Sequence, residues 1–317
     1  MDFTQRMFAR LLLRQQLVDM DGTQFERFVD RLLGLLHADY LPVRAHGPLG
    51  DVGADGLMLS EKILYACYSP RTEVLADVRK KFRSDLHKAM TKRKGTFTTF
   101  RFTVNDSRDP GIHPFLSLTI SRARTKVHPV GIDIYDADRI GSDVVRLDLV
   151  EVEDLLGTPI PVEDRVYSIG LANLAPLLEH LGTRRRTSAP LDAIPDVNAY
   201  KIEFNRARVG PEVHAALTEG LRYSHLVDAY YAGLNSVDEH DRVAQGFRAY
   251  YSQVRDEPGS DEDLWHRLHQ YIVGNRSVTI TTTKCASIIL AHFFERCDLY
   301  EVPPAGWTPG APGQEDT

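Results

Sequence analysis

The hydrophobic periodicity of this chain changes partway along it, and this change constrains the fold more than any other feature. Before residue 160, short apolar runs typical of strands, such as KILYACY and TFTTFRFTV, alternate with segments of helical apolar spacing. After residue 190 the spacing turns helical. Alternating helices and strands indicate an α/β domain, and sustained helical spacing indicates an all-α domain. We therefore predict two domains of different fold class.

The predicted domain boundaries come from changes in composition and from stretches rich in proline, glycine or arginine. We expect an α/β domain over residues 1–160, a linker over 161–189 that includes the arginine-rich GTRRRTSAP, and a helical domain over 190–304. The Pro- and Gly-rich end, 305–317, is predicted to be disordered. A chain of 317 residues is long enough for two separate cores.

Charge and cysteine content narrow the class of protein. The net charge of −6 conceals an asymmetry, since residues 1–160 hold 23 Lys and Arg against 22 Asp and Glu. An acidic protein can still bind nucleic acid where its basic residues gather. Three cysteines without zinc-type spacing and the lack of a long apolar run predict a cytoplasmic protein outside the membrane.

A glycine-rich run in the first half is the clearest candidate for chemistry. The helical segment 23–37 starts with Thr23 and Glu26, which fit a capping box, and GDVGADG follows it with Asp51 and Asp55. Asp55 directly precedes an apolar strand, a junction where the backbone is exposed yet fixed by the sheet behind it. Phosphodiester hydrolysis needs a divalent cation held by such carboxylates, and Mg²⁺ prefers one or two of them.

This order of features resembles the restriction-endonuclease-like, or PD-(D/E)XK-like, superfamily, particularly its Mrr-like branch. The resemblance implies a metal-dependent nuclease in which Glu26 matches the helix glutamate, Asp55 the metal-binding aspartate and Asp51 an earlier aspartate. The strand should then end in Gln-x-Lys or Glu-x-Lys. Ala66 and Tyr68 stand at those two positions, so the family's lysine and its neighbour are absent from the strand.

The next helical segment can supply a displaced lysine. Lys81 and Asp85 are four residues apart and share one helix face, and Lys88 lies on the same arc. We predict Asp55 and Glu26 as ligands of Mg²⁺ or Mn²⁺, Lys81 as the residue that stabilises charge, and Asp85 as a supporting carboxylate. Asp51 is a weaker candidate for the same site.

The same segment is predicted to bind DNA. Arg79–Lys94 contains eight basic residues and one acid, a density that favours a phosphate-facing surface as much as a solvated one. The candidate contacts are Lys80, Lys88, Lys92, Arg93 and Lys94.

Each of these residues also has an ordinary structural interpretation. Glycine-rich aspartates stabilise turns, and capping alone accounts for Glu26. Cys67 is expected to be a buried strand residue, because no histidine is placed to activate it.

Two segments of the second half carry another resemblance. NAYKIEFNR (198–206) and LAHFFERCDLYEVPP (290–304) look like the ends of the C-terminal domain of bacterial ABC-three-component defence systems, which include Lamassu-type systems. The resemblance implies an effector held inactive by an SMC-like ABC ATPase and a small middle component. Released effectors would self-associate and cut double-stranded DNA.

Aromatic residues near the C-terminus are candidates for partner docking: Phe293, Phe294, Leu299 and Tyr300. They could equally form the core of a helical domain. Taken together, the sequence predicts a metal-dependent DNA endonuclease effector of an anti-phage complex. The alternative is a catalytically inactive, nuclease-fold DNA-binding or adaptor subunit of the same complex.

Overall fold

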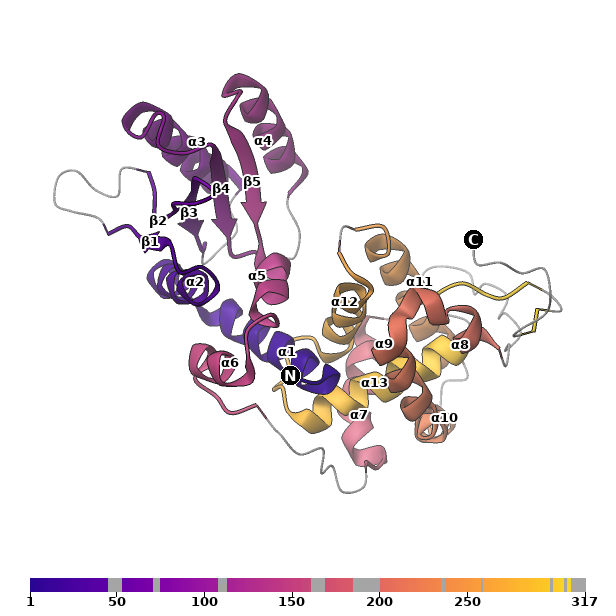
Figure 1. The fold of residues 1–317 in the computed structure, drawn as a ribbon. Coiled ribbons are helices and arrows are strands. Elements are labelled where there is room, and N and C mark those ends of the chain that lie inside the picture. Colours follow the sequence, from indigo (N-terminus) through magenta and orange to yellow (C-terminus); the bar gives the residue numbers. More distant parts are fainter. Residues whose placement is uncertain are drawn as a thin grey trace. The chain divides into compact units, whose positions relative to one another are not determined.

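The computed structural model describes residues 1–44, 53–70, 75–107, 113–160, 169–184, 200–234, 238–257, 259–296, 299–304 and 307–308. Its contacts divide the chain into two compact units. One comprises Leu12–Ile160 with Met1, and the other comprises Asp2–Leu11 and Pro161–Thr317. The first combines a sheet with helices and the second is helical, as the change in periodicity predicts (Figure 1).

A five-stranded mixed sheet lies at the centre of the α/β unit, in the order β1-β2-β3-β4-β5. The strands are β1 (Tyr40–Pro42), β2 (Gly56–Met58), β3 (Ile63–Tyr68), β4 (Thr99–Val104) and β5 (Gly131–Tyr135). Antiparallel pairing joins β1, β2 and β3, whereas β3, β4 and β5 are parallel. Each parallel connection passes through a helix, because parallel neighbours need a long crossover.

Two crossover helices pack on one face of this sheet. The helices of the unit after α1 are α2 (Gly22–Leu36), α3 (Leu75–Lys92), α4 (Pro114–Lys126), α5 (Ala137–Val144) and α6 (Leu149–Leu156). Buried residues of α3 and α4, such as Phe82 and Leu116, form an apolar cluster with Leu64, Phe100 and Ile132 of β3, β4 and β5. Helix α2 packs against β1 and β3. The alternation of strand side chains thus separates an apolar face from the face that carries Tyr65 and Arg101.

The start of α2 differs from the prediction. The capping box is made by Asp21 and Gln24, whose side chains each accept a hydrogen bond from the other's backbone N–H at 2.9 Å. The expected pair, Thr23 and Glu26, lies two residues further on and belongs to the helix itself. Both pairs fit the same spacing rule, and the earlier one caps the helix. Glu26 is therefore not the capping residue.

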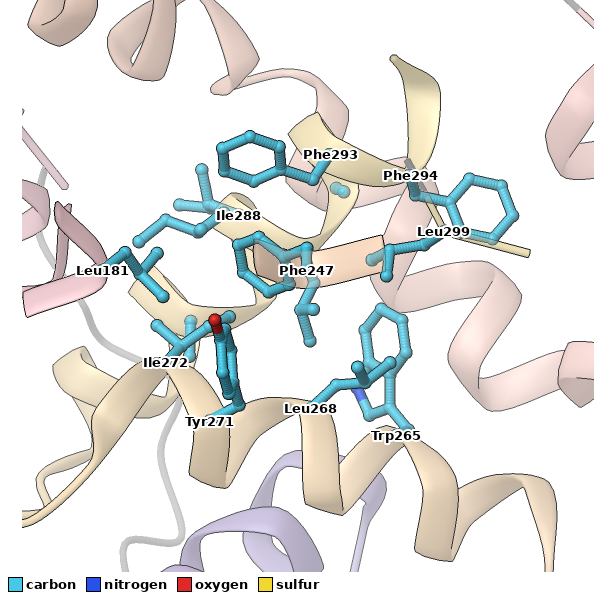
Figure 2. Close-up of a cluster of buried hydrophobic side chains, with 14 of the residues drawn as sticks. Leu181, Phe247, Trp265, Leu268, Tyr271, Ile272, Ile288, Phe293, Phe294 and Leu299 are labelled. Atoms are coloured by element: carbon cyan, nitrogen blue, oxygen red, sulfur yellow. The ribbon is translucent and has the colours of Figure 1, made fainter. Parts of the chain in front are cut away.

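The helices that the structure describes in the second unit are α7 (Leu171–Thr183), α8 (Lys201–Phe204), α9 (Arg206–Leu221), α10 (Ser224–Ala232), α11 (Glu239–Val254), α12 (Asp261–Val273) and α13 (Ile280–Glu295). Helix α13 contacts α7, α9, α10 and α12. It approaches α9 closely at Gly220, where an added Cβ would lie 2.8 Å from the Cβ of Ala291. Large side chains fill the centre of this unit, among them Phe247, Trp265 and Phe293 (Figure 2).

The linker prediction is wrong for part of 161–189. Residues Leu171–Thr183 form α7, whose Leu174, Leu177, Leu178 and Leu181 are buried in the core of the helical unit. These leucines recur at helical spacing, so the segment buries an apolar stripe like any other core helix. Residues 185–190, which include part of the arginine-rich run, lie outside the described residues.

The helical unit also includes Asp2 and the first part, Phe3–Leu11, of the N-terminal helix α1 (Phe3–Asp19). Met7 and Leu11 join the core of that unit. Arg6 forms an ion pair with Glu262 at 3.0 Å, and Arg10 pairs with Asp263 at 2.5 Å. The predicted assignment of these residues to the α/β domain is therefore wrong, because tertiary contacts outweigh their position in the chain. Within the part of the chain that the structure describes, no helix is long and apolar enough to cross a membrane.

Candidate functional site

Asp55 is held at the junction where β2 begins beside β3. Its backbone N–H donates to the Tyr65 carbonyl at 2.8 Å, and its Oδ2 accepts a hydrogen bond from the Cys67 N–H at 2.6 Å. The residue is only 7% exposed. The sheet therefore fixes the carboxylate and buries most of the residue.

The turn before Asp55 lies directly against α3. Gly53 has a φ of +76°, and a Cβ added there would lie 2.7 Å from both the Asp85 carbonyl oxygen and the Lys88 Cβ. Only glycine combines this left-handed conformation with such a close approach. The glycine thus brings the Asp55 segment next to the turn of α3 that carries Asp85 and Lys88. Asp51 lies outside the described residues.

Two lysines of α3 converge on a buried carboxylate. Lys81 Nζ lies 2.8 Å from Asp85 Oδ2, and Lys88 Nζ lies 3.8 Å from Asp85 Oδ1. Asp85 is 1% exposed, whereas the side chain of Lys81 keeps 32% of its surface in solvent. A buried anion beside the Gly53 turn therefore holds both ammonium groups, and the i, i+4 pairing of Lys81 with Asp85 occurs as the sequence predicts.

Cys67 marks the centre of the charged neighbourhood. Burial strongly raises the pKa of its thiol, the nearby carboxylates of Asp55, Asp30 and Glu26 raise it further, and Lys81 lowers it. Charged groups from α2, from the Asp55 turn and from α3 therefore all influence the pKa of this one thiol on β3. The high thiol pKa keeps Cys67 neutral, which is the opposite of what a nucleophilic cysteine needs.

Asp30 and Tyr40 belong to this neighbourhood and are absent from the sequence prediction. The Tyr40 hydroxyl donates to Asp30 Oδ1 at 2.6 Å, and burial raises the pKa of the Asp30 carboxyl. The Tyr40 hydroxyl occupies the space that a Cβ on Gly56 would need. Asp30 follows Glu26 by four residues, so the i, i+4 spacing on α2 was the available signal.

The strand positions expected to hold Gln-x-Lys are occupied by packed side chains. Ala66 is 1% exposed and lies in the apolar cluster under α3 and α4. Tyr68 packs against the same cluster and stacks on Phe102 with ring centroids 6.4 Å apart. The apolar surroundings of Ala66 would penalise a charged glutamate there, whereas the half-buried Tyr68 still reaches solvent. The departure from the family pattern is thus built into the packing of β3.

The described residues do not assemble a many-ligand metal centre. No three His, Cys, Asp or Glu side chains within the described ranges are close enough together to hold a metal ion. The carboxylates of Asp55, Glu26 and Asp85 offer hard oxygen donors, and Mg²⁺ commonly binds through one or two carboxylates while keeping several waters. These three carboxylates do not form one ligand group, so a site for Mg²⁺ in the described residues would use at most two of them together with water.

The predicted DNA contacts lie on α3 and just beyond its end. Lys80, Lys88, Lys92 and Lys94 are exposed, and Arg93 is half-buried. The buried face of the helix is formed by Val78, Phe82, Asp85, Leu86 and Ala89. The structure therefore leaves the lysines accessible to a polyanion.

The predicted docking residues of the helical unit are core residues. Phe293, Phe294, Leu299 and Tyr300 are all buried, and Figure 2 shows Phe293, Phe294 and Leu299 among the side chains of the core cluster. Their assignment to partner docking is wrong for this structure, because aromatic composition alone does not separate an interface from a core. Any docking surface must use other side chains.

The two ends of the C-terminal sequence motif meet through polar contacts. Lys201 is 1% exposed, and its ammonium donates to the carbonyls of Phe294, at 2.8 Å, and Leu299. The Asn205 side chain donates to the Glu301 carbonyl at 2.9 Å and accepts from the Glu301 N–H at 3.3 Å. Lys201 and Asn205 therefore clamp the chain where it leaves α13. The motif is explained by folding, since it satisfies carbonyls at a helix C-terminus.

Comparison with known families bears on this second unit. Residues 172–301 match the family model described as C-terminal domain 10 of the ABC-three component (ABC-3C) systems. No curated protein and no solved structure matches the chain. The matched range runs from the start of α7 to the residue clamped by Asn205, and it supports membership of this chain in an ABC-three-component system.

Proposed function

We propose that this chain is the effector of an ABC-three-component anti-phage system, and that its α/β unit is a metal-dependent DNA endonuclease. The observation that carries the proposal is the contact of the Gly53 turn, two residues before the buried Asp55, with the part of α3 where Asp85 pairs with Lys81. Glu26, Asp55 and Lys81 match the expected order of helix glutamate, metal-binding aspartate and displaced lysine. The fixed orientation of Asp55 and the adjacent basic helix support a phosphodiester substrate.

Each residue has a distinct role in the proposed site. Asp55, with Glu26, would hold Mg²⁺ or Mn²⁺, which when bound activates water and neutralises charge on the phosphate. The Cys67 N–H orients the Asp55 carboxylate through its Oδ2. Asp85, whose backbone carbonyl lies against Gly53, would be a positioning residue that holds Lys81 by a 2.8 Å ion pair. Lys81 would then stabilise the negative charge that develops at phosphorus.

Substitution of Asp55 by asparagine tests this assignment. Asp55→Asn keeps an oxygen that can accept from the Cys67 N–H, so the fold should persist while the charge is lost. With Mg²⁺ and the isolated full chain, we expect cleavage of duplex DNA to fall by about 100-fold or more, the scale on which losing one strong electrostatic contribution acts. The measurement is nicking of supercoiled plasmid, with thermal melting as the folding control.

Asp154→Asn is the matched control, since Asp154 is an exposed aspartate of α6 whose partner is the surface residue Arg31. It removes the same charge from the same unit without touching the site. If Asp55→Asn cuts DNA as fast as the wild-type chain, the proposed metal ligand is wrong.

An inactive nuclease fold is the second candidate function. The observation that favours it is the apolar packing of Ala66 and Tyr68 at the positions of the family's Gln and Lys. A binding or adaptor subunit would hold duplex DNA in EDTA with a strong salt dependence and would show no Mg²⁺-dependent nicking. Detection of nicking that Asp55→Asn abolishes eliminates this candidate.

The helical unit supports a proposal about partners. The family match favours docking on an SMC-like ABC ATPase together with a small middle component, in an assembly that restrains the effector until foreign DNA is sensed. Release would allow self-association of the effector. Co-expression with both components should yield a complex with lower nicking activity than the isolated chain, and a complex with undiminished activity contradicts the restraint.

A further inference from the structure

Helix α4 presents a basic outer face that neither the sequence prediction nor the proposed site uses. Its buried side is formed by Leu116 and Thr119, with Ile120 and Ala123 packed beside them. Arg122, Arg124 and Lys126 are exposed. The helix, Pro114–Lys126, contains no acidic residue. Arg122 and Lys126, four residues apart, lie on one flank of this outer face and Arg124 lies on the other, and no carboxylate of the same helix can neutralise them.

This face continues the basic surface of α3. The two helices contact each other and cover the same side of the sheet, where their apolar residues share one cluster (Figure 1). The outward side of α3 carries exposed Lys80, Arg83 and Lys92. Its two acidic residues are Asp77, in the first turn, and Asp85, which is buried beside Lys81 and Lys88. The combined surface is thus nearly free of competing negative charge.

The dimensions of this surface suit an extended polyanion. With a rise of about 1.5 Å per residue, the 18 residues of α3 and the 13 residues of α4 span roughly 27 Å and 20 Å. Side-by-side helices are separated by about 8–10 Å. Phosphates along duplex DNA place a negative charge every ~1.7 Å of axis, so several can be neutralised across such a surface.

The N-terminal end of α4 adds an apolar contact. Phe115 is 60% exposed and stacks on the ring of His113 with centroids 5.7 Å apart. Leu118 is also exposed, one turn before Arg122 on the same side of the helix. Exposed rings of this kind stack on the unpaired bases of single strands, so contact with a duplex would rest on the basic residues.

We propose that α3 and α4 form one phosphate-binding surface for duplex DNA, with Arg122, Arg124 and Lys126 as its contribution from α4. This inference rests on the proposed DNA substrate and extends the contact surface beyond α3. Arg124 and Lys126 also lie in the last turn of α4, where cations stabilise the helix dipole. That structural role would affect thermal stability but not the salt dependence of DNA binding.

The test compares two triple variants of the full chain in EDTA, where cleavage cannot interfere. Arg122→Gln/Arg124→Gln/Lys126→Gln removes the α4 cations while keeping good helix formers. Arg31→Gln/Arg206→Gln/Arg255→Gln removes the same charge from exposed sites on α2, at the start of α9 and just after α11. Binding to a labelled 30-base-pair duplex is followed by fluorescence anisotropy at several salt concentrations, with melting temperature as the folding control.

We expect the α4 variant to raise Kd by about tenfold or more and to lower the salt slope by roughly 2–3, because three phosphate contacts are lost. The control variant should shift both values much less. The inference is overturned if the α4 variant has the Kd and the salt slope of the wild-type chain. Loss of binding to an acidic protein partner would not change that conclusion, because the proposed ligand is duplex DNA. Weaker binding to single strands alone, with duplex binding unchanged, also overturns it.

The outcome is separable from that of the proposed function. If Asp55→Asn abolishes nicking while the α4 variant binds duplex as the wild-type chain does, the endonuclease proposal stands and the surface proposal fails. If the α4 variant loses duplex binding but the wild-type chain never nicks DNA, the surface proposal stands and the endonuclease proposal fails.

Discussion

Two lysines, one in each unit, show how differently the two halves of this chain use charge. Lys201 in the helical unit is 1% exposed and donates to two backbone carbonyls, of Phe294 and Leu299. Lys81 in the α/β unit pairs with a buried aspartate but keeps about a third of its side chain in solvent. Each lysine belongs to a segment that carries a family resemblance.

The difference teaches what each resemblance can establish. In the helical unit, the motif residues satisfy backbone groups inside a core, so the motif reports a fold. In the α/β unit, the matching Asp55 accepts a hydrogen bond from the Cys67 N–H near the end of a strand, and the two strand positions that differ hold Ala66 and Tyr68, which pack on the apolar cluster. There the resemblance concerns chemistry, which packing alone does not establish.

The largest expected contrast is between two phenylalanines. Phe294→Ala in the helical unit should lower the free energy of unfolding by about 3–5 kcal/mol, because Phe294 is fully buried and its removal leaves a cavity. Phe115→Ala in the α/β unit should change it by less than about 0.5 kcal/mol, since Phe115 is mostly exposed. Urea denaturation measures both. A Phe115 variant as destabilised as the Phe294 variant would show that the end of α4 is packed rather than available to a ligand.

The two lysines give the next contrast. Lys201→Met should lower stability by about 3 kcal/mol, because two buried carbonyls lose their donor. Lys81→Met should change stability by no more than about 1 kcal/mol, as expected for a partly exposed ion pair, yet it should abolish nicking. Denaturation and plasmid nicking are measured on both variants. Wild-type nicking by Lys81→Met protein would remove that residue from the proposed mechanism.

Lowering the pH should affect the stability of the two units differently, because their buried titratable groups have pKa shifts with opposite effects on the free energy of unfolding. His269 Nδ1 donates to the Trp265 carbonyl, its Nε2 shares a hydrogen bond with the Ser287 hydroxyl, and burial lowers its pKa to about 4. In the unfolded chain the histidine pKa is ~6.5, so as the pH falls the unfolded state binds a proton before the folded state does. The contribution of His269 to the free energy of unfolding is therefore complete above about pH 6.5 and is lost as the pH falls toward 4. Burial raises the pKa of Asp30 in the α/β unit, which has the opposite effect.

We expect the His269 contribution to fall by about 2 kcal/mol between pH 7 and pH 5. His269→Gln, which cannot be protonated, should lose correspondingly less stability over that range when unfolding is followed by tryptophan fluorescence. If the free energy of unfolding of the variant falls between pH 7 and pH 5 by as much as that of the wild-type chain, other groups cause the acid sensitivity.

Local patterns in the sequence account for much of the fold. The apolar runs at 63–68 and 99–104 are strands, and the helical spacings at 239–254, 261–273 and 280–295 are helices. The pairing of Lys81 with Asp85 also followed from spacing on one helix. These features depend on residues a few positions apart, so their periodicity is visible without the rest of the molecule.

Other features could not be read from local patterns because distant parts of the chain decide them. Spacing permits both a Thr23–Glu26 and an Asp21–Gln24 capping box, and the folded helix uses the latter. The core of the helical unit buries α7, although its sequence stands beside an arginine-rich run. Phe293 and Phe294 could have served an interface or a core, and only packing makes them core residues.

By itself, the sequence determined the division into an α/β part and a helical part, the position of Asp55 before a strand, and the basic character of α3. Only the tertiary structure brought Gly53 against α3, added Asp30 and Tyr40 to the neighbourhood of Cys67, placed α4 beside α3, and joined Asp2–Leu11 to the helical unit. The physical reason is the separation along the chain of the residues that decide each feature. Secondary structure follows from periodic contacts between near neighbours, whereas a site depends on side chains that meet only when distant segments pack together.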